Sequence, residues 1–290
     1  MDERAALALV ADAVAGAGDD AAVVDETVIT TDMLHESTDF PAGTTRYTAG
    51  WRSVAASLSD VAAMGAAPTA AVAVYAAPVF ERDDLRAFLD GAQAVCAAVD
   101  ASYVGGDLDS HEEFTVATTA LGETADPVGR DGARPGDRVG VTGRLGRSAA
   151  AVRLFETDPD RANDLFRFRP RTDAGVALAP HASAMMDVSD GLAHSLHAIA
   201  DAGDVGVAVD WDAVPVADAV AAVAGETAEY RDLALSYGED FELLCTVPPD
   251  AIEAARADCP VRLADIGTVT RSGVELDGEP LPDRGYAHGE

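Results

Sequence analysis

The sequence predicts a mixed α/β fold in two domains. Apolar segments of strand length alternate with Ala-rich segments of helical periodicity along all 290 residues, in an order that allows many antiparallel strand pairs. A turn-rich stretch with Pro135 and Gly136 interrupts this alternation near the middle of the chain. Because 290 residues suffice for two ordinary domains, we expect one domain over residues 1–135 and a second over residues 136–290.

In the first half, the expected helices end at residues that break regular structure. An Ala-rich helix over 5–15 ends at Gly16, and a helix over 48–64 ends at Gly65. A third helix, over 83–99, is amphipathic. Strands are expected over 25–32, 70–76, 102–107 and 114–122.

The second half restarts with a strand over 138–143 and a Gly-containing turn that opens a helix over 148–155. The tail over 266–281 is expected to fold as a β-hairpin, with Asp277-Gly278 supplying a second turn. Between them we expect strands at 205–211 and 240–248, and helices at 192–201, 216–223 and 250–257, with the segment over 182–191 leading into the first of these helices.

The charge balance is extreme, with 51 acidic residues against 20 basic ones and a net charge of -31. Such acidity strains a compact fold by self-repulsion, which concentrated salt relieves, so we infer a salt-rich cytoplasm. No basic stripe is present to neutralise phosphates along a nucleic acid, which makes DNA or RNA an unexpected partner.

All 20 basic residues are arginine, and the chain contains no lysine. A Walker A loop and the ATP site of a protein kinase both need a lysine, as does Schiff-base chemistry, so these classes are excluded. Any phosphate handling must therefore depend on arginine, on backbone N–H groups or on metal ions.

The cysteines Cys96, Cys245 and Cys259 have no metal-ligand spacing and are expected to be reduced and buried. The acidic N-terminus lacks the charge pattern of a signal peptide. Residues 61–80 carry no charge, but Pro68 and the many alanines favour a helix end, a turn and a buried strand over a membrane span. We expect no membrane partner and a cytoplasmic location.

Asp60 is the most conspicuous acid, because it is the only one between Phe40 and Phe80. It lies on a helix of small apolar residues, where a carboxylate needs a partner or a metal ion. The alternative is a solitary carboxylate on the helix surface, hydrogen-bonded to a nearby serine or arginine.

Other acids follow or interrupt apolar runs, at places where strand ends can converge on one edge of a sheet. Converging carboxylates repel each other and any phosphate, and Mg²⁺ removes both problems because it binds carboxylates and phosphate oxygens together. Simpler interpretations stay open: Asp190 as a helix N-cap, and Asp20 and Asp107 as turn acids. The candidate acids are Asp20, Asp32, Asp60, Asp107, Asp187 and Asp190.

Two further features suggest anion binding. The Gly-x-x-Gly turn at Gly143 and Gly146 opens a helix whose N–H groups could hold an anion, although such turns are often only structural. Arg130 is a candidate phosphate clamp, with a surface ion pair as the alternative. His194 and His197 share a helix face but lack a third metal ligand.

Seven segments follow in order over nearly the whole chain: GDDAAVV, TTDML followed by DF, SLSDVAAMGA, VGGD, VGRDGARPGD with VTG, MDVSDGL and YGEDFELL. In this order they resemble the thiamine-monophosphate kinases, a family of the aminoimidazole-ribonucleotide-synthetase-like superfamily. GEDFELL and the IGTV…LDGEPL tail favour the kinase over its relatives. The resemblance implies a synthetase-like fold in which the N-terminal sheets of two subunits form a homodimer.

The resemblance also implies an activity, transfer of the ATP γ-phosphoryl group to thiamine monophosphate, and roles for individual residues. Gly106, Arg130 and Ser189 would contact ATP, and Glu239 and Tyr286 the thiamine moiety. Asp107, Asp60 and Arg130 are the residues expected to be catalytic. Magnesium ions would be held by Asp20, Thr30, Thr31, Asp32, Asp60, Asp107, Asp187 and Asp190.

One position departs from the family pattern. Asp39 stands where the family usually has a substrate-binding histidine, and His35 precedes it by one helical turn in number. An acid there would favour the cationic thiazolium ring, or the contact is lost. Asp39 is therefore a third expected substrate-binding residue.

The acceptor phosphate is already a nucleophile at neutral pH, so the protein must align two anions and cancel their repulsion rather than supply a general base. The alternatives are another ATP-dependent member of the superfamily, such as a ring-closing synthetase, selenophosphate synthetase or hydrogenase-maturation dehydratase, and a non-catalytic nucleotide-binding protein. Against two of these, the first cysteine is Cys96 and the chain does not end in cysteine.

Overall fold

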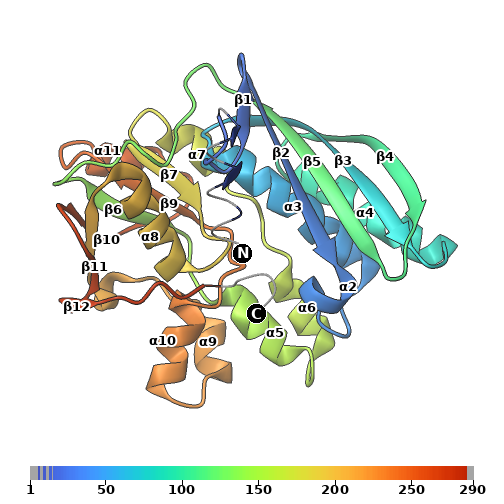
Figure 1. The fold of residues 1–290 in the computed structure, drawn as a ribbon. Coiled ribbons are helices and arrows are strands. Elements are labelled where there is room, and N and C mark those ends of the chain that lie inside the picture. Colours follow the sequence, from blue (N-terminus) through green and yellow to red (C-terminus); the bar gives the residue numbers. More distant parts are fainter. Residues whose placement is uncertain (1–5, 7–8, 11–12, 15, 286–290) are drawn as a thin grey trace.

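The chain forms two sheets that lie side by side, each with helices packed on it, as the computed structural model in Figure 1 shows. The structure describes residues 6, 9–10, 13–14 and 16–285. The helix expected over 5–15 and the expected substrate residue Tyr286 lie wholly or mostly outside the described residues. In the described part of the chain no helix has both the length and the apolar character that crossing a membrane requires.

The first sheet has five strands in the order β1-β2-β5-β3-β4, antiparallel except for the parallel pair β3 and β4. Helices α3 and α4 cover one face (Figure 1). Apart from the helix over 5–15, the predicted elements of this half are found, and three of the four strands are longer than expected. The elements are β1 (Ala22–Val24), β2 (Thr27–His35), α2 (Glu36–Asp39), α3 (Arg46–Ala63), β3 (Ala67–Ala77), α4 (Arg82–Ala98), β4 (Ser102–Ser110) and β5 (Thr115–Glu123).

The other face of this sheet is not covered by the described chain, and strand alternation turns several apolar side chains outward on it. Ile29 and Met33 on β2, Val74 on β3 and Val104 on β4 are exposed there. A monomeric soluble protein rarely leaves such an apolar face in water.

Helix α3 is buried along most of its length because it lies between the two sheets. Thr45 caps its first turn by accepting a hydrogen bond from the Thr48 N–H at 3.2 Å. Gly175 on helix α7 (Thr172–Leu178) comes so close to α3 that a Cβ there would meet the Ala62 carbonyl oxygen at 2.1 Å. The close approach holds the two halves of the molecule together along α3.

The second sheet has seven strands in the order β12-β11-β8-β10-β6-β9-β7. Helix α8 (Leu192–Gly203) packs on one face, and α7 and α11 (Ile252–Asp258) pack on the other. Its strands are β6 (Arg138–Thr142), β7 (Ala184–Asp187), β8 (Gly206–Val209), β9 (Leu243–Val247), β10 (Leu263–Thr270), β11 (Val274–Leu276) and β12 (Glu279–Pro280).

The expected C-terminal hairpin is wrong in its pairing. β10 and β11 are not partners, because β8 lies between them, antiparallel to β10 and parallel to β11. The turn at Asp277-Gly278 does form a hairpin, but it joins β11 to the two-residue strand β12.

The helices of the second half are α5 to α11, with one short 3₁₀ helix. Three of them, α6, α7 and α10, were not expected from the sequence. The helices are α5 (Arg147–Leu154), α6 (Pro159–Phe166), α7 (Thr172–Leu178), α8 (Leu192–Gly203), η1 (Trp211–Ala213), α9 (Asp218–Val223), α10 (Thr227–Leu235) and α11 (Ile252–Asp258).

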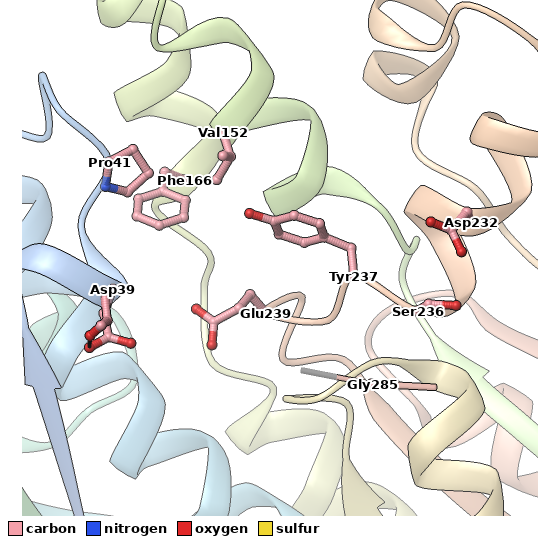
Figure 2. Close-up of a pocket in the computed structure, with 10 residues that line it drawn as sticks. Asp39, Pro41, Val152, Phe166, Asp232, Ser236, Tyr237, Glu239 and Gly285 are labelled. Atoms are coloured by element: carbon pink, nitrogen blue, oxygen red, sulfur yellow. Dashed lines mark hydrogen bonds between the residues drawn. The ribbon is translucent and has the colours of Figure 1, made fainter. Parts of the chain in front are cut away.

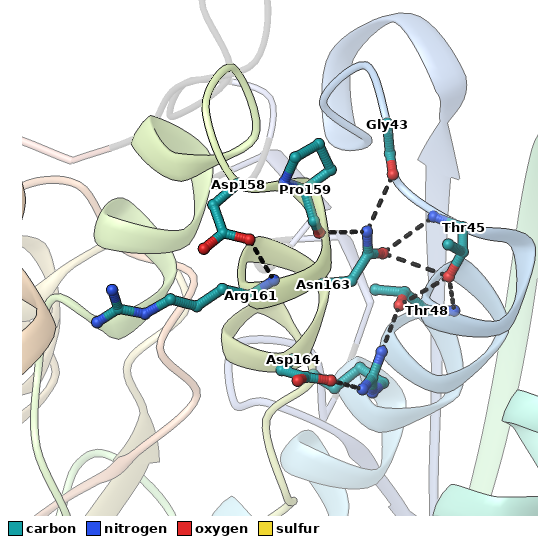
Figure 3. A network of polar contacts seen from close by, with 9 residues as sticks. Gly43, Thr45, Thr48, Asp158, Pro159, Arg161, Asn163 and Asp164 are labelled. Carbon is teal, nitrogen blue, oxygen red and sulfur yellow. Dashed lines mark hydrogen bonds and ion pairs between the residues drawn. The ribbon is translucent and has the colours of Figure 1, made fainter.

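Helix α6 is fixed to the start of α3 by a polar network centred on Asn163 (Figure 3). The Asn163 amide oxygen accepts from the Thr45 N–H at 3.0 Å, and its NH₂ group donates to the carbonyls of Gly43 and Pro159 at 3.0 and 2.8 Å. The core of the first sheet accordingly takes in side chains of α5 and α6, from beyond the turn at residue 136.

The three cysteines are buried, as expected. Cys96 lies in the core under the first sheet, and Cys245 and Cys259 lie in a core of the second. Burial raises the pKa of Cys96 to about 11 and that of Cys245 to about 12, and it also raises the pKa of Cys259.

Candidate metal and phosphate site

Three of the expected aspartates meet at the junction of the two sheets. Asp20 precedes β1, Asp60 lies in the last turn of α3, and Asp187 ends β7. One carboxylate oxygen of each lies within 4.8 Å of the other two, although the three residues are far apart in the sequence. Asp60 is therefore not a solitary surface carboxylate.

Hydroxyl groups on β2 and α3 hold two of these carboxylates in place. Thr30 Oγ1 donates to Asp60 at 2.6 Å, and Ser59 Oγ donates to Asp187 at 2.7 Å. Thr30 thus lies at the cluster as expected, bound to an aspartate through its side chain.

Asp32 lies beside these three residues, on the covered face of β2. Ser57 Oγ donates to its carboxylate at 2.7 Å. Burial raises its pKa, and the negative charges of Glu239 and Asp20 add to the rise. Asp32 is thus a fourth acid of the same group.

Burial and mutual repulsion both make these carboxylates unfavourable as anions. Burial raises the pKa of Asp60 and of Asp187 well above the ordinary value, and the charges of neighbouring aspartates raise both further. A cation placed among them would remove the repulsion. Carboxylate oxygens are the ligands that Mg²⁺ prefers, so the residues present fit that ion.

Arg130 is the one described arginine at this cluster. It binds Asp20 in a bidentate ion pair, with Nη2–Oδ1 and Nε–Oδ2 distances of 2.9 and 3.1 Å, and its N–H donates to Asp19 at 2.7 Å. Burial alone would lower the pKa of Arg130, but Asp20 and Asp187 hold that pKa above its usual value. The single guanidinium leaves the cluster strongly negative.

Thr31 does not join this group through its side chain. Its hydroxyl is on the opposite face of β2 and donates to the Thr118 carbonyl at 2.9 Å. Ser189 and Asp190 follow Asp187 in the loop to α8, so they lie next to the cluster along the chain. The N-cap of α8 is Gly191 rather than Asp190, so the N-cap interpretation of Asp190 is wrong.

Gly106 and Asp107 lie elsewhere in the described chain. They are on β4, the edge strand, three strands from β2 in the sheet. At the usual strand spacing this is about 14 Å. The register pairs Asp107 with Val74, an exposed residue of the open face. A single chain therefore does not bring Asp107 to the cluster.

A cavity of about 340 Å³ opens between the two halves of the molecule (Figure 2). Asp39 and Glu239, two expected substrate residues, face it from opposite sides, as Figure 2 shows. Asp39 accepts hydrogen bonds from the His35 N–H and the Thr38 hydroxyl, both at 2.7 Å. Asp232 and Tyr237 also line the cavity, although the sequence did not single them out as site residues. For Tyr237, the available signal was its position two residues before Glu239.

Glu239 is held by Arg52, a second residue that sequence reasoning missed. Arg52 is fully buried in α3, over the ring of Phe166 at 3.7 Å. Its guanidinium pairs with the Glu239 carboxylate and donates to the Glu239 carbonyl at 3.1 Å. The signal available was an arginine in the middle of a helix made mostly of small residues.

The Gly-x-x-Gly turn does not offer its N–H groups to a ligand. The N–H groups of Gly146 and Ser148 both donate to the carboxylate of Asp240, the latter at 3.0 Å. The helix N-terminus thus binds an anion that belongs to the chain itself, and the expected anion site is wrong. Burial raises the pKa of Asp240 to about 6.

Comparison with known proteins gives consistent matches. The family model for the N-terminal domain of AIR synthase related proteins matches residues 18–124, and that for the C-terminal domain matches residues 134–277. The thiamine-monophosphate kinase of Halobacterium salinarum is 62% identical over 99% of this chain and 100% of its own length. That of Methanospirillum hungatei is 41% identical over 90% of this chain and 88% of its own length.

Among solved structures, AaThiL complexed with AMPPCP and TMP has a TM-score of 0.90 at 28% identity, covering 99% of this chain and 97% of that one. A thiamine-monophosphate kinase from Stenotrophomonas maltophilia has a TM-score of 0.82 at 33% identity, covering 95% of each chain. The hydrogenase maturation protein HypE in complex with ATP, at 19% identity and a TM-score of 0.70, shares the fold.

Proposed function

We propose, from the premise that the chain belongs to the thiamine-monophosphate kinases, a family of AIR synthase related proteins, that it transfers the γ-phosphoryl group of ATP to thiamine monophosphate. The products are thiamine diphosphate and ADP. The observation that carries this proposal is the convergence of Asp20, Asp60 and Asp187 beside a cavity that contains Glu239. The cluster can neutralise phosphates only through bound cations.

The residues that would hold Mg²⁺ are those at the cluster, namely Asp20, Asp32, Asp60 and Asp187, with Asp190 next to them. Bound there, the metal supplies positive charge to phosphate oxygens during transfer. The Thr30 and Ser59 hydroxyls fix the carboxylates before any ligand arrives. We assign Arg130 and Ser189 to ATP, since both lie beside these acids.

The thiamine moiety fits the cavity of Figure 2. Three acidic residues, Asp39, Asp232 and Glu239, line it, which favours a ligand carrying a positive charge such as a thiazolium ring. Tyr237 adds an aromatic ring on which such a cation can stack. Tyr286 remains a predicted contact, and Gly285 just before it lines the same cavity.

Gly106 and Asp107 belong in this proposal as residues of a partner subunit. We assign residues 1–135 to metal and ATP binding and to dimerisation, and residues 136–290 to completing the site. The open apolar face of the first sheet is suited to pairing with a second copy of itself. Asp107 is paired in register with Val74, which is exposed on that face. In such a dimer, the Asp107 of each subunit would therefore lie toward the other subunit.

The reaction is tested by phosphorus NMR on thiamine monophosphate and Mg-ATP in molar potassium chloride. Thiamine diphosphate and ADP, formed in equal amounts, are expected. Release of inorganic phosphate without a new diphosphate would refute the proposal and point to another superfamily activity.

The origin of Asp107 is tested by mixing two inactive variants, Asp60→Asn and Asp107→Asn, as dimers refolded together. If Asp107 acts in the partner's site, a mixed dimer has one site with both substitutions and one site with neither. The mixture then regains about a quarter of the wild-type turnover. Absence of recovery would place Asp107 in its own chain's site or outside the site.

A further inference from the structure

Five of the 20 arginines line a single surface hollow of about 510 Å³ that plays no part in the site described above. Only two acids, Asp218 and Glu242, line the same hollow. Five positive charges against two give a net of +3, in a chain whose net charge is -31. The arginines are Arg144, Arg147, Arg161, Arg171 and Arg262.

Two of these arginines already have acidic partners. Arg171 binds Glu242 with two contacts of 2.6 Å, and Arg144 pairs with Asp218. Both acids of the hollow are thereby used. The other three arginines make no ion pair with any described residue, in a chain that carries 51 acids.

Arg147 is the most unusual of the three. Its Nη2 atom is buried and has no hydrogen-bond partner among the described residues. Burial lowers the pKa of Arg147 to about 10, since neither Asp240 nor Glu242 offsets the loss of water. A buried donor without an acceptor is unfavourable, so this group is suited to an external one.

The hollow is separate from the substrate cavity. The two share no lining residue, although α5 and α6 contribute to both. On α5, Arg147 of the hollow and Val152 of the cavity are five positions apart. On α6, Arg161 and Phe166 are also five positions apart. Five positions correspond to a rotation of about 140° around a helix, so the two residues of each pair lie on different faces. An anion in the hollow would therefore be bound on the far side of these helices.

The arginines are presented by fixed elements. Helix α6 is held by the Asn163 network, and Figure 3 shows the Arg161 side chain extending away from that network. Arg147 is in the first turn of α5, and Arg262 immediately precedes β10. Three guanidinium groups that make no ion pair with a described residue thus converge from three separate parts of the chain.

We propose that this hollow binds a small molecule that carries a polyphosphate group, through Arg147, Arg161 and Arg262. Guanidinium groups bind phosphate oxygens with pairs of N–H donors, and three groups on different elements require several charged oxygens at once. The hollow is also large enough for such a ligand. A halide ion is a poorer fit, because a single spherical ion cannot contact three separated guanidinium groups.

The test uses inorganic tripolyphosphate as the probe, titrated calorimetrically into the full chain with EDTA present. Without divalent cations the aspartate cluster repels tripolyphosphate. The heat of binding therefore comes from tripolyphosphate that binds in the hollow. One site per chain is expected in the wild type and in Asp60→Asn. Arg262→Gln and Arg161→Gln, whose side chains are exposed and have no acidic partner among the described residues, each lower the affinity about tenfold.

The matched controls are Arg82→Gln and Arg86→Gln. Both arginines line a hollow of similar volume, about 530 Å³, on α4, and neither has an acidic partner in the described part of the chain. The affinities of these two control variants for tripolyphosphate should stay within twofold of the wild-type affinity. The proposal is overturned if the wild type gives no heat, if the controls lose as much affinity as the hollow variants, or if Asp60→Asn abolishes binding.

Discussion

Two groups of carboxylates differ in the partners that the chain supplies: every acid of the first group has a cationic or N–H partner, whereas the four acids of the second share one described arginine. Glu239 has Arg52, Glu242 has Arg171, and Asp240 has two backbone N–H groups. The second group, Asp20, Asp32, Asp60 and Asp187, has hydroxyl donors and a single arginine. The first group, the paired group, stabilises the fold. In the second, the unpaired group, only Asp20 binds a described arginine, so the group requires charge from outside the chain.

The contrast separates functional acids from structural ones better than composition does. In a chain with 51 acids, the number of carboxylates near a site carries little information. The presence or absence of a cationic partner for each buried carboxylate carries much more, because an unpaired charge in the interior is unfavourable. The two groups should therefore respond in opposite ways to substitution.

The largest effect is expected at Asp60, in the unpaired group. Asp60→Asn removes one carboxylate from the proposed metal site and should lower turnover by about 10³-fold, while the fold survives. Release of ADP in a coupled assay measures the loss, and circular dichroism checks the fold. Asp201→Asn, on the exposed side of α8, is the matched control. Near-normal turnover in Asp60→Asn would contradict the metal assignment.

The paired group should lose stability when a partner is removed. Arg52→Met leaves Glu239 without its cation and should lower the free energy of unfolding by about 2 kcal/mol. Urea titration in constant potassium chloride measures it, and adding Glu239→Gln should restore part of the loss. Arg46→Met, at a partly exposed ion pair with Glu36, should cost less than about 1 kcal/mol.

The same variant also tests the substrate assignment. Because Glu239 is proposed to contact the thiamine moiety, Arg52→Met should raise the KM for thiamine monophosphate more than the KM for ATP. Equal changes in both would mean that Arg52 acts only on stability.

Mg²⁺ should reverse the stability order of the wild type and Asp60→Asn. In EDTA, the variant has less repulsion in the unpaired group and should melt about 3 °C above the wild type. Added Mg²⁺ should raise the Tm of the wild type and have little effect on the variant. Scanning calorimetry at fixed potassium chloride makes the measurement. A variant that melts below the wild type in EDTA would contradict the repulsion argument.

The smallest effect is expected at Asp240, in the paired group. Burial raises its pKa from 3.8 to about 6, so the folded protein binds this proton more tightly than the unfolded chain does. The stability from this residue is therefore present at low pH and lost as the pH rises through about 6. From about pH 7 to about pH 5, the wild type should gain about 1 kcal/mol relative to Asp240→Asn. A difference in unfolding free energy that does not change with pH would contradict this.

The sequence was sufficient where a local signal was strong. The segment of mostly small residues over 48–64, ended by Gly65, predicted α3, and the scarcity of acids around Asp60 was enough to single it out as a site residue. Helix α6 had a comparable signal that was overlooked, since Asp158 caps it and Pro159 occupies its first turn.

Other features depend on contacts between distant residues and leave no local pattern. The insertion of β8 between β10 and β11 is set by the packing of the whole sheet. The pairing of Arg52 with Glu239 spans 187 positions, and the carboxylate of Asp240 binds the Gly-x-x-Gly turn from 94 positions away. Propensity and spacing do not determine which distant groups meet.

The cysteines give a way to follow the motions of the two halves separately. Only the thiolate form of cysteine reacts readily with alkylating reagents, and burial keeps Cys96, Cys245 and Cys259 protonated and out of reach. Each thiol becomes modified only when its surroundings open. The rate at which Cys96 is alkylated would time the opening of the first sheet, and the rates at Cys245 and Cys259 that of the second, without any engineered label.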